Sequence, residues 1–234
     1  MTDHTIVLIP GLICDRTVWA PVLDQLGPDV VVADLTSQSD ITDMARDCLA
    51  LAEGRLRVAG HSMGARVALE MARMAPNRID RLALLDTGIH PLKDGEREKR
   101  EEIVAFAHAN GMQALCDRWL PGMVHPDRHG DADLMDALTA MVLRQTPDIH
   151  ARQIKALVNR PDAAAYLREI ACPVLLMVGR QDSWSPVSQH EDMLALLPDA
   201  RLVVIEDAGH FAPVERPTET AAALVPFLQE DTSL

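Results

Sequence analysis

The chain has 234 residues, of which 48% are hydrophobic and 24% are charged, and its formal net charge is -13. This composition is typical of a globular domain and excludes a disordered chain, a collagen and a disulfide scaffold. Because an acidic chain repels phosphate backbones and anionic lipid surfaces, we expect neither a nucleic acid nor a membrane as a partner.

Short runs rich in Val, Ile and Leu recur along the chain. Runs of this length are typical of strands that are buried on both faces of a parallel sheet. In chain order they are Ile6–Ile9, Val30–Ala33, Leu56–Ala59, Leu82–Leu85, Val174–Val178 and Leu202–Ile205. The third run is the weakest, because Arg57 interrupts it.

Helical patterns separate most of these runs. They cover Thr42–Glu53, Ala65–Ala75, Ser188–Leu197 and Thr218–Gln229. The clearest, Ala65–Ala75, is stopped by Pro76, and Pro226 is expected to kink or end the last one. This alternation predicts an α/β fold with a mostly parallel, doubly wound sheet and right-handed crossovers.

The alternation breaks between residues 92 and 168, where no apolar strand run occurs. Helical patterns cover Asp94–Asn110, Met112–Leu120, Asp131–Gln145, Asp148–Val158 and Ala163–Arg168. Because strand character resumes at Val174, an insertion is favoured over a separate helical domain. We therefore expect one catalytic unit, with a core of residues 1–91 and 169–234 and an inserted helical cap, or lid, of residues 92–168.

Residues 60–64 read Gly-His-Ser-Met-Gly, a G-x-S-x-G motif between a predicted strand and a predicted helix. This context is that of a nucleophile elbow, a strained turn that exposes a serine hydroxyl at the edge of a sheet. Gly60 and Gly64 leave the room that such a turn needs. Ser62 is therefore the candidate nucleophile.

A serine hydroxyl becomes nucleophilic when a base accepts its proton. His210 is the candidate base, because it follows the strand Leu202–Ile205. Loops after parallel strands meet at one edge of the sheet, where the elbow also lies. His61 adjoins the serine, but its side chain is expected to point away and to pack or hydrogen-bond beneath the elbow.

Two aspartates follow core strands and compete to orient the base. Asp182 comes after Val174–Val178, and Asp86 comes after Leu82–Leu85. Asp182 is favoured because Gly179 frees its loop to turn back toward the edge of the sheet. Asp86 is instead expected to hydrogen-bond to the backbone near the junction with the helical insertion.

An oxyanion hole needs two backbone N–H groups aimed at the developing negative charge. Met63 is one candidate donor, because it follows the serine at a helix N-terminus. The other is Leu12, in the Pro10-Gly11-Leu12 loop after the first strand, where Gly11 lets the backbone turn inward.

The motifs together resemble the α/β-hydrolase superfamily, and within it the branch of small cytoplasmic carboxylesterases and enol-lactonases. The matching segments are LIPGLICDRTVW (8–19), AGHSMGARVALEMA (59–72), LLDTG (84–88), GRQDSWSP (179–186) and DAGHFAPVERP (207–217). The order Ser, Asp, His along the chain is that of this superfamily. The resemblance implies Ser62 as nucleophile, Asp182 as acid, His210 as base, and Leu12 and Met63 as oxyanion donors.

One position departs from the pattern, because Pro10 stands where many relatives carry histidine before the glycine. The donor is a backbone N–H, so its function is expected to survive. The resemblance also implies that residues 92–168 form the cap and that no cofactor or metal is needed.

Several reactions share this scaffold, and the residues leave them open. A small-molecule ester is the expected substrate; alternatives are an enol-lactone or other lactone, a thioester or a carbon–carbon bond. Cofactor-free dioxygenases, lyases and small-molecule receptors of the same fold are further alternatives. Trp184 and Met123 are candidate substrate contacts.

The cysteines and histidines indicate neither a metal site nor a disulfide framework. Cys14, Cys48, Cys116 and Cys172 are far apart and form no C-x-x-C pair. His125 and His129 are four residues apart, but Pro126 lies between them and favours a loop. The N-terminal sequence has no basic region followed by a long apolar run. We therefore expect a cytoplasmic monomer or homodimer with free thiols.

Overall fold

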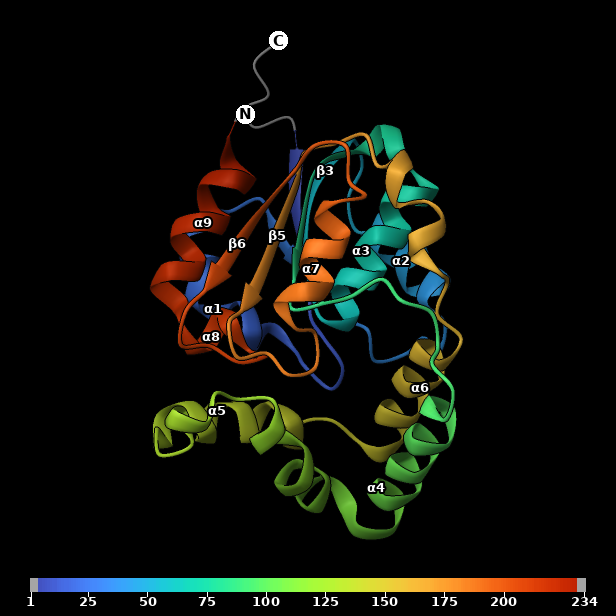
Figure 1. Ribbon diagram of the computed structural model, residues 1–234, viewed down its shortest axis with the longest axis vertical. Helices are drawn as coiled ribbons and strands as arrows, with labels where there is room; N and C mark the ends of the chain where they lie inside the picture. The colour runs from blue at the N-terminus through green and yellow to red at the C-terminus, as the bar shows by residue number, and fades with distance from the viewer. Residues whose placement is uncertain (1–3, 231–234) are drawn as a thin grey trace.

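A six-stranded parallel sheet organises the computed structural model, which describes residues 4–230 (Figure 1). The ends of the predicted core, residues 1–3 and 231–234, lie outside the described residues. The strands are β1 (His4–Ile9), β2 (Val30–Val32), β3 (Arg55–His61), β4 (Ile79–Leu85), β5 (Val174–Gly179) and β6 (Ala200–Ile205). They follow the order β2-β1-β3-β4-β5-β6, so every predicted strand and the doubly wound sheet are confirmed.

Arg57 does not break β3, although its charge weakens the apolar pattern there. Its side chain is buried, and Nη1 donates a hydrogen bond to the carbonyl oxygen of Leu228 at 2.9 Å. Leu228 belongs to α9 (Pro217–Gln229), which packs on this face of the sheet. The buried guanidinium therefore satisfies a carbonyl in the last turn of that helix.

Helices cover both faces of the sheet. One layer contains α1 (Ala20–Leu26), α8 (Ala212–Glu215) and α9, and the other contains α2 (Ile41–Leu49), α3 (Met63–Met74) and α7 (Val187–Leu194) (Figure 1). Ile6 and Leu8 belong to the core under the first layer, whereas Val7 and Ile9 belong to the core under the second. This alternation explains why the strands carry apolar residues on both faces of the sheet.

Several predicted helices end differently from expectation; the helix predicted to reach Leu197 ends at Leu194, for example. The helix predicted to reach Glu53 ends at Leu49, where Arg78 donates hydrogen bonds to the carbonyls of Leu49, Ala52 and Gly54. Conversely, α9 continues through Pro226 to Gln229. Pro226 lies on the exposed side of the helix, and burial of the residues that follow it extends the helix.

Between β4 and β5 the chain forms α4 (Glu96–Trp119), α5 (Ala132–Leu143) and α6 (Pro147–Val158). The two helices predicted up to Leu120 are joined into α4, but Gly111 has a non-helical backbone with φ 83°. Residues 163–169 form short 3-10 turns instead of the predicted helix. Figure 1 shows α4–α6 beyond the arrowheads of the strands, at the carboxyl edge of the sheet. Whether this segment acts as a lid remains a prediction.

None of the helices within residues 4–230 is both long and apolar enough to cross a membrane. All four cysteines are free thiols, and Cys14, Cys48 and Cys116 are buried.

The turn from β3 into α3 depends on backbone contact at Gly60. A Cβ atom there would lie 2.5 Å from Cα of Ala65 in the helix. We expect Gly60→Ala to lower the free energy of unfolding by about 1–3 kcal/mol, because the strand and helix would have to move apart. Gly130→Ala is the matched control, because its Cβ would meet no heavy atom within 4 Å. Thermal unfolding of both variants measures the difference, and equal melting temperatures would contradict this account of the turn.

Candidate active site

Ser62 lies at the junction of β3 and α3, in a backbone conformation that is rare for a residue with a side chain. Its φ is 54°. The turn is held by two hydrogen bonds: Ser62 N donates to the Leu85 carbonyl at 2.8 Å, and Thr87 Oγ1 donates to the Ser62 carbonyl at 3.0 Å. The G-x-S-x-G motif therefore forms the strained strand-to-helix turn expected from the sequence, and β4 braces it.

The loops after β5 and β6 bring Asp182 and His210 to this serine. Nε2 of His210 lies 2.8 Å from Oγ of Ser62, and Nδ1 of His210 lies 2.8 Å from Oδ2 of Asp182. Asp182 and His210 are buried. The three side chains form a continuous hydrogen-bonded chain through which the hydroxyl proton can pass to an imidazole oriented by a carboxylate.

The surroundings of Asp182 favour its ionised form. Burial by itself raises the pKa of this carboxyl, but the charge and hydrogen bond of His210 and two backbone amides outweigh it and hold the pKa below its ordinary value. The amides are those of Trp184 and Ser185, which donate to Oδ1 at 2.8 and 2.9 Å. Oδ2 is left to accept the hydrogen bond from His210.

Asp86, the competing carboxylate, does not contact His210. Its Oδ1 accepts a hydrogen bond from Gly179 N at 2.9 Å, as expected for a backbone-bonding role. Its Oδ2 lies 3.8 Å from Nε2 of His61. Burial, and then the negative charge of Asp182, raise the pKa of Asp86 well above its ordinary value. The two aspartates therefore favour opposite protonation states.

His61 lies beneath the elbow and holds the backbone of His210. Its Nε2 is 2.7 Å from the carbonyl oxygen of His210, so this nitrogen is the donor. Burial, and then the charge of His210, lower the pKa of His61 to about 3, so the ring is neutral near pH 7. This is the hydrogen bond beneath the elbow that the sequence predicted.

Leu12 and Met63 both line the cavity that contains Ser62. Within residues 4–230, neither N–H donates a hydrogen bond to the protein. Met63 is the first residue of α3, where an amide has no partner in its own helix. A Cβ on Gly11 would lie 3.2 Å from Cβ of Ser62, which shows how closely the Leu12 loop approaches the serine.

Two buried side chains that support the site were missed from the sequence. Glu215 accepts hydrogen bonds from the amides of Gly209, Phe211 and His125 at 2.8–3.1 Å. It thereby fixes the loop on both sides of His210. Glu215 lies five residues after His210, in a chain segment that turns back on itself. This position was the sequence feature that could have indicated its role.

The second is Gln153 of α6, whose Oε1 accepts a hydrogen bond from Ile13 N at 2.7 Å. Its Nε2 donates to the Leu35 carbonyl at 3.0 Å. Ile13 follows Leu12 and has φ 49°, which is unfavourable for a β-branched residue. Gln153 holds this strained turn although it is distant from Ile13 in the sequence. No local residue spacing indicated this contact.

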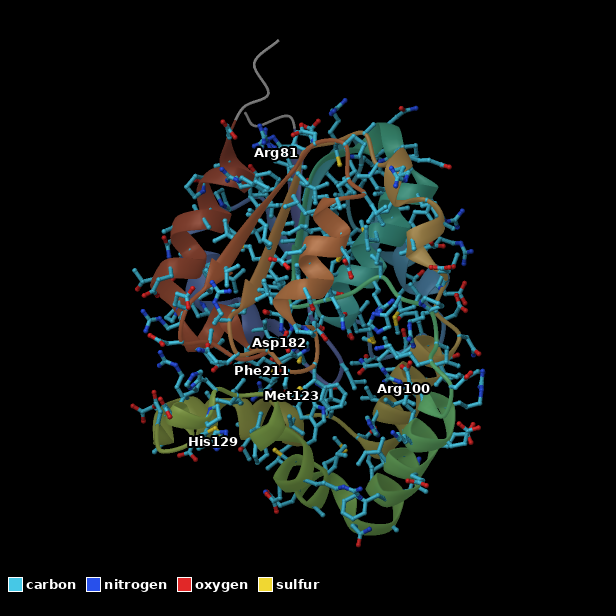
Figure 2. The ribbon with its side chains drawn as sticks, in the orientation of Figure 1. Arg81, Arg100, Met123, His129, Asp182 and Phe211 are labelled. Carbon is cyan, nitrogen blue, oxygen red and sulfur yellow. The ribbon has the colours of Figure 1, made fainter. Side chains whose placement is uncertain are left out.

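A cavity of about 680 Å³ opens in front of Ser62. Leu12, Met63 and His210 line it, as do the two predicted substrate contacts, Trp184 and Met123. Figure 2 shows Met123 of the inserted segment beside Phe211, and the carbonyl of Met123 accepts a hydrogen bond from His210 N at 2.7 Å. The inserted segment is thus tied directly to the residue that bonds to Ser62.

No cluster of His, Cys, Asp and Glu that could hold a metal ion occurs among residues 4–230. Nδ1 of His125 accepts a hydrogen bond from Asp127 N, and Nε2 of His129 lies 3.2 Å from the Val124 carbonyl. These two histidines therefore bond to backbone groups.

Comparisons with known proteins identify the family and the fold of this chain. The chain is 27% identical over 223 residues to a protein named "Putative carbamate hydrolase RutD" from Pseudomonas savastanoi pv. phaseolicola, covering 90% of this chain and 83% of that protein. It is 24% identical to a pimeloyl-acyl-carrier-protein methyl ester esterase from Aliivibrio salmonicida, covering 97% and 92%.

A solved structure of a thermophilic esterase from Thermogutta terrifontis, with malate bound, superposes with a TM-score of 0.89 at 25% identity. That match covers 97% of this chain and 90% of the esterase. The enol-lactonase from Burkholderia xenovorans LB400 shares the fold, with a TM-score of 0.89 at 24% identity. The model of the alpha/beta hydrolase family matches residues 6–223. The chain therefore belongs to the alpha/beta hydrolase family.

Proposed function

We propose that this hydrolase cleaves a small-molecule carboxylic ester through an acyl-enzyme intermediate. The observation that carries the proposal is the chain of two 2.8 Å contacts from Ser62 Oγ through His210 to Asp182. It lies on a cavity large enough for a small molecule. Two relatives named for ester and carbamate hydrolysis support the same class, because both reactions break a bond between an acyl carbon and a heteroatom.

In the proposed first step, Oγ of Ser62 attacks the ester carbonyl while Nε2 of His210 accepts its proton. The carbonyl oxygen becomes an oxyanion, which the N–H groups of Leu12 and Met63 stabilise. The C–O bond to the alcohol then breaks, and His210 gives its proton to the leaving oxygen.

Deacylation repeats these steps with water. His210 takes a proton from water, the hydroxide attacks the acyl carbon, and the proton returns to Oγ of Ser62 as the ester bond breaks. Asp182 stays ionised throughout and stabilises the imidazolium, in keeping with its lowered pKa. The chain itself supplies every group in this scheme, so the proposed reaction needs no cofactor.

We further propose that residues 92–168 act as a cap over the cavity. Met123 of this segment lines the cavity, and its carbonyl accepts the amide hydrogen of His210. Trp184, on the loop after β5, also lines the cavity and is 55% exposed, so its ring is available to a substrate. Met123 and Trp184 are therefore proposed to contact the substrate.

The nucleophile is tested by covalent labelling. A fluorophosphonate is expected to add once, at Ser62, because among residues 4–230 this is the hydroxyl that is hydrogen-bonded to the proposed base. Peptide mapping identifies the modified residue, and modification of Ser183 or Ser185 instead would contradict the assignment. Ser62→Ala is expected to lower kcat on a 4-nitrophenyl ester by roughly 10³-fold or more.

The acid is tested by a matched pair of amide substitutions. Asp182→Asn is expected to lower kcat by up to about 10⁴-fold, because the amide cannot hold the imidazole in its reactive tautomer. Asp86→Asn is expected to lose far less, since an amide oxygen can still accept the hydrogen bond from Gly179. If Asp86→Asn is the crippled enzyme instead, the two roles must be exchanged.

The pH dependence of stability tests whether the pKa of Asp86 is raised in the folded protein. Because its pKa is raised in the folded state, wild-type protein loses stability as pH rises from the unfolded value of about 3.9 through the folded value. Asparagine has no proton to lose. Melting temperatures are therefore expected to shift in favour of Asp86→Asn as pH increases from 4 to 8.

Gln153 is predicted to position the oxyanion loop. Gln153→Met removes the acceptor for Ile13 N, and the neighbouring Leu12 N–H is then free to move. We expect kcat to fall by about 10-fold or more with little change in KM, as for a weakened oxyanion donor. The exposed Gln113→Met on α4 is the control. A fall in melting temperature without a change in kcat would show a structural role alone.

A further inference from the structure

The cavity is rich in positive charge, although the chain as a whole carries -13. Six arginine or lysine side chains line it, against three carboxylates. The cations are Arg66, Lys93, Lys99, Arg100, Arg118 and Arg160. An excess of cations inside a cavity of an acidic protein points to an anionic ligand.

Arg66 is the cation closest to Ser62 in the chain, four residues further along α3. Ser62 is the N-cap of α3 and has a non-helical backbone, and both Ser62 and Arg66 line the cavity. Helical side chains lean toward the N-terminus of the helix, and the N-terminus of α3 is the end that carries Ser62. Arg66 therefore extends toward the cavity on the same side as the serine.

The guanidinium of Arg66 has no carboxylate partner in the described part of the chain. Its only hydrogen bonds are two long contacts of 3.5 Å to the His90 carbonyl. The nearby Glu96 is already occupied, because it accepts two hydrogen bonds from Arg160 and one from Arg100, all at 2.8 Å. Burial, and then the charges of Arg160 and Arg100, lower the pKa of Arg66 to about 9. A bound anion would relieve this repulsion.

The cavity has two chemically different ends. Figure 2 shows Arg100 well separated from Met123, Phe211 and Asp182. Met123, Phe211 and Trp184 give the end near His210 an apolar lining. In the proposed reaction His210 protonates the leaving alcohol, so the alcohol leaves at this apolar end. The acyl half of the substrate then extends toward the cationic end.

We propose that the acyl half of the substrate carries a carboxylate that binds the guanidinium of Arg66, which makes the substrate a half-ester of a short dicarboxylic acid. This inference rests on the proposed esterase function. A guanidinium can hold a carboxylate through two parallel N–H···O bonds, which fixes both the position and the direction of the acyl chain. Hydrolysis converts the half-ester and water into the dicarboxylate, an alcohol and a proton.

The test compares two esters that differ in one group. Monomethyl glutarate carries a carboxylate where methyl valerate carries a methyl group. The wild-type enzyme is expected to show a kcat/KM at least about 30-fold higher for monomethyl glutarate. Arg66→Gln is expected to lose that preference, mainly through KM, while its kcat/KM for methyl valerate changes less than about threefold. Arg66→Lys keeps the charge but loses the bidentate geometry, so it is expected to recover part of the preference.

Arg118→Gln is the matched control for general charge, because Arg118 lines the same cavity but its guanidinium stacks on Phe106 at 5.0 Å. It is expected to keep most of the preference. Equal losses in Arg118→Gln and Arg66→Gln would overturn the specific role of Arg66. Equal hydrolysis of both esters by wild-type enzyme would overturn the carboxylate proposal. A preference for 3-acetoxybenzoate over phenyl acetate that depends on Arg66 would also overturn it, because 3-acetoxybenzoate carries its carboxylate in the alcohol half.

Binding of glutarate, the expected product, separates this inference from the proposed function. Calorimetry is expected to show that Arg66→Gln weakens glutarate binding at least 10-fold, whether or not the protein turns over an ester. Glutarate binding that depends on Arg66, without hydrolysis of any ester, would contradict the esterase proposal alone. Ester hydrolysis that requires Ser62, without such binding, would contradict the carboxylate site alone.

Discussion

Close contact between backbones at the carboxyl edge of the sheet is the constraint on which the site depends. A Cβ on Gly64 would lie 2.6 Å from the Pro10 carbonyl oxygen, so the first turn of α3 rests directly on the loop that carries Leu12. A Cβ on Gly179 would lie 2.5 Å from the Ala208 carbonyl oxygen, which brings the loop of Asp182 against the loop of His210. Larger residues at these positions would separate the groups that must meet.

Within that frame, the environment of each buried carboxyl group decides its role. Asp182 receives two amide hydrogen bonds and faces the imidazole of His210, so it is ionised. Asp86 receives one amide and lies near the charge of Asp182, so its neutral form is favoured. Glu215 accepts three amides and organises the loop around His210. The same carboxyl group is therefore an ionised partner of the imidazole in Asp182, a neutral hydrogen-bonding group in Asp86 and an acceptor that fixes a loop in Glu215.

The sequence predicted those parts of the molecule that local pattern determines. Apolar runs located all six strands, and the G-x-S-x-G motif located the elbow, because both depend on neighbouring residues. Post-strand position brought Asp182 and His210 to Ser62 because parallel strands end at a common edge. It could not by itself separate Asp182 from Asp86, since both follow core strands, and the separation comes from which carboxylate faces the imidazole.

Contacts between distant segments could not be predicted from local sequence patterns. Gln153 lies 140 positions after Ile13 in the chain, and no spacing rule relates an amide side chain on one helix to a strained loop residue. Arg57 looked like an interruption of β3 because its acceptor, the Leu228 carbonyl, is 171 positions away. In each case the partner of a buried polar group lies in a distant segment that only the tertiary fold brings close.

The charge of the cavity shows why net charge is a poor guide to the ligand. Exposed charges more than about 8 Å apart are largely screened at physiological ionic strength, so the -13 of the whole chain acts mainly on the approach of other macromolecules. Inside the cavity, less water lies between a small anion and the nearest cations, so their attraction is screened less. Arg66 lacks a carboxylate partner among residues 4–230. An acidic exterior and a cationic interior are therefore compatible. The first is expected to disfavour phosphate backbones, and the second is proposed to favour a small carboxylate bound to Arg66.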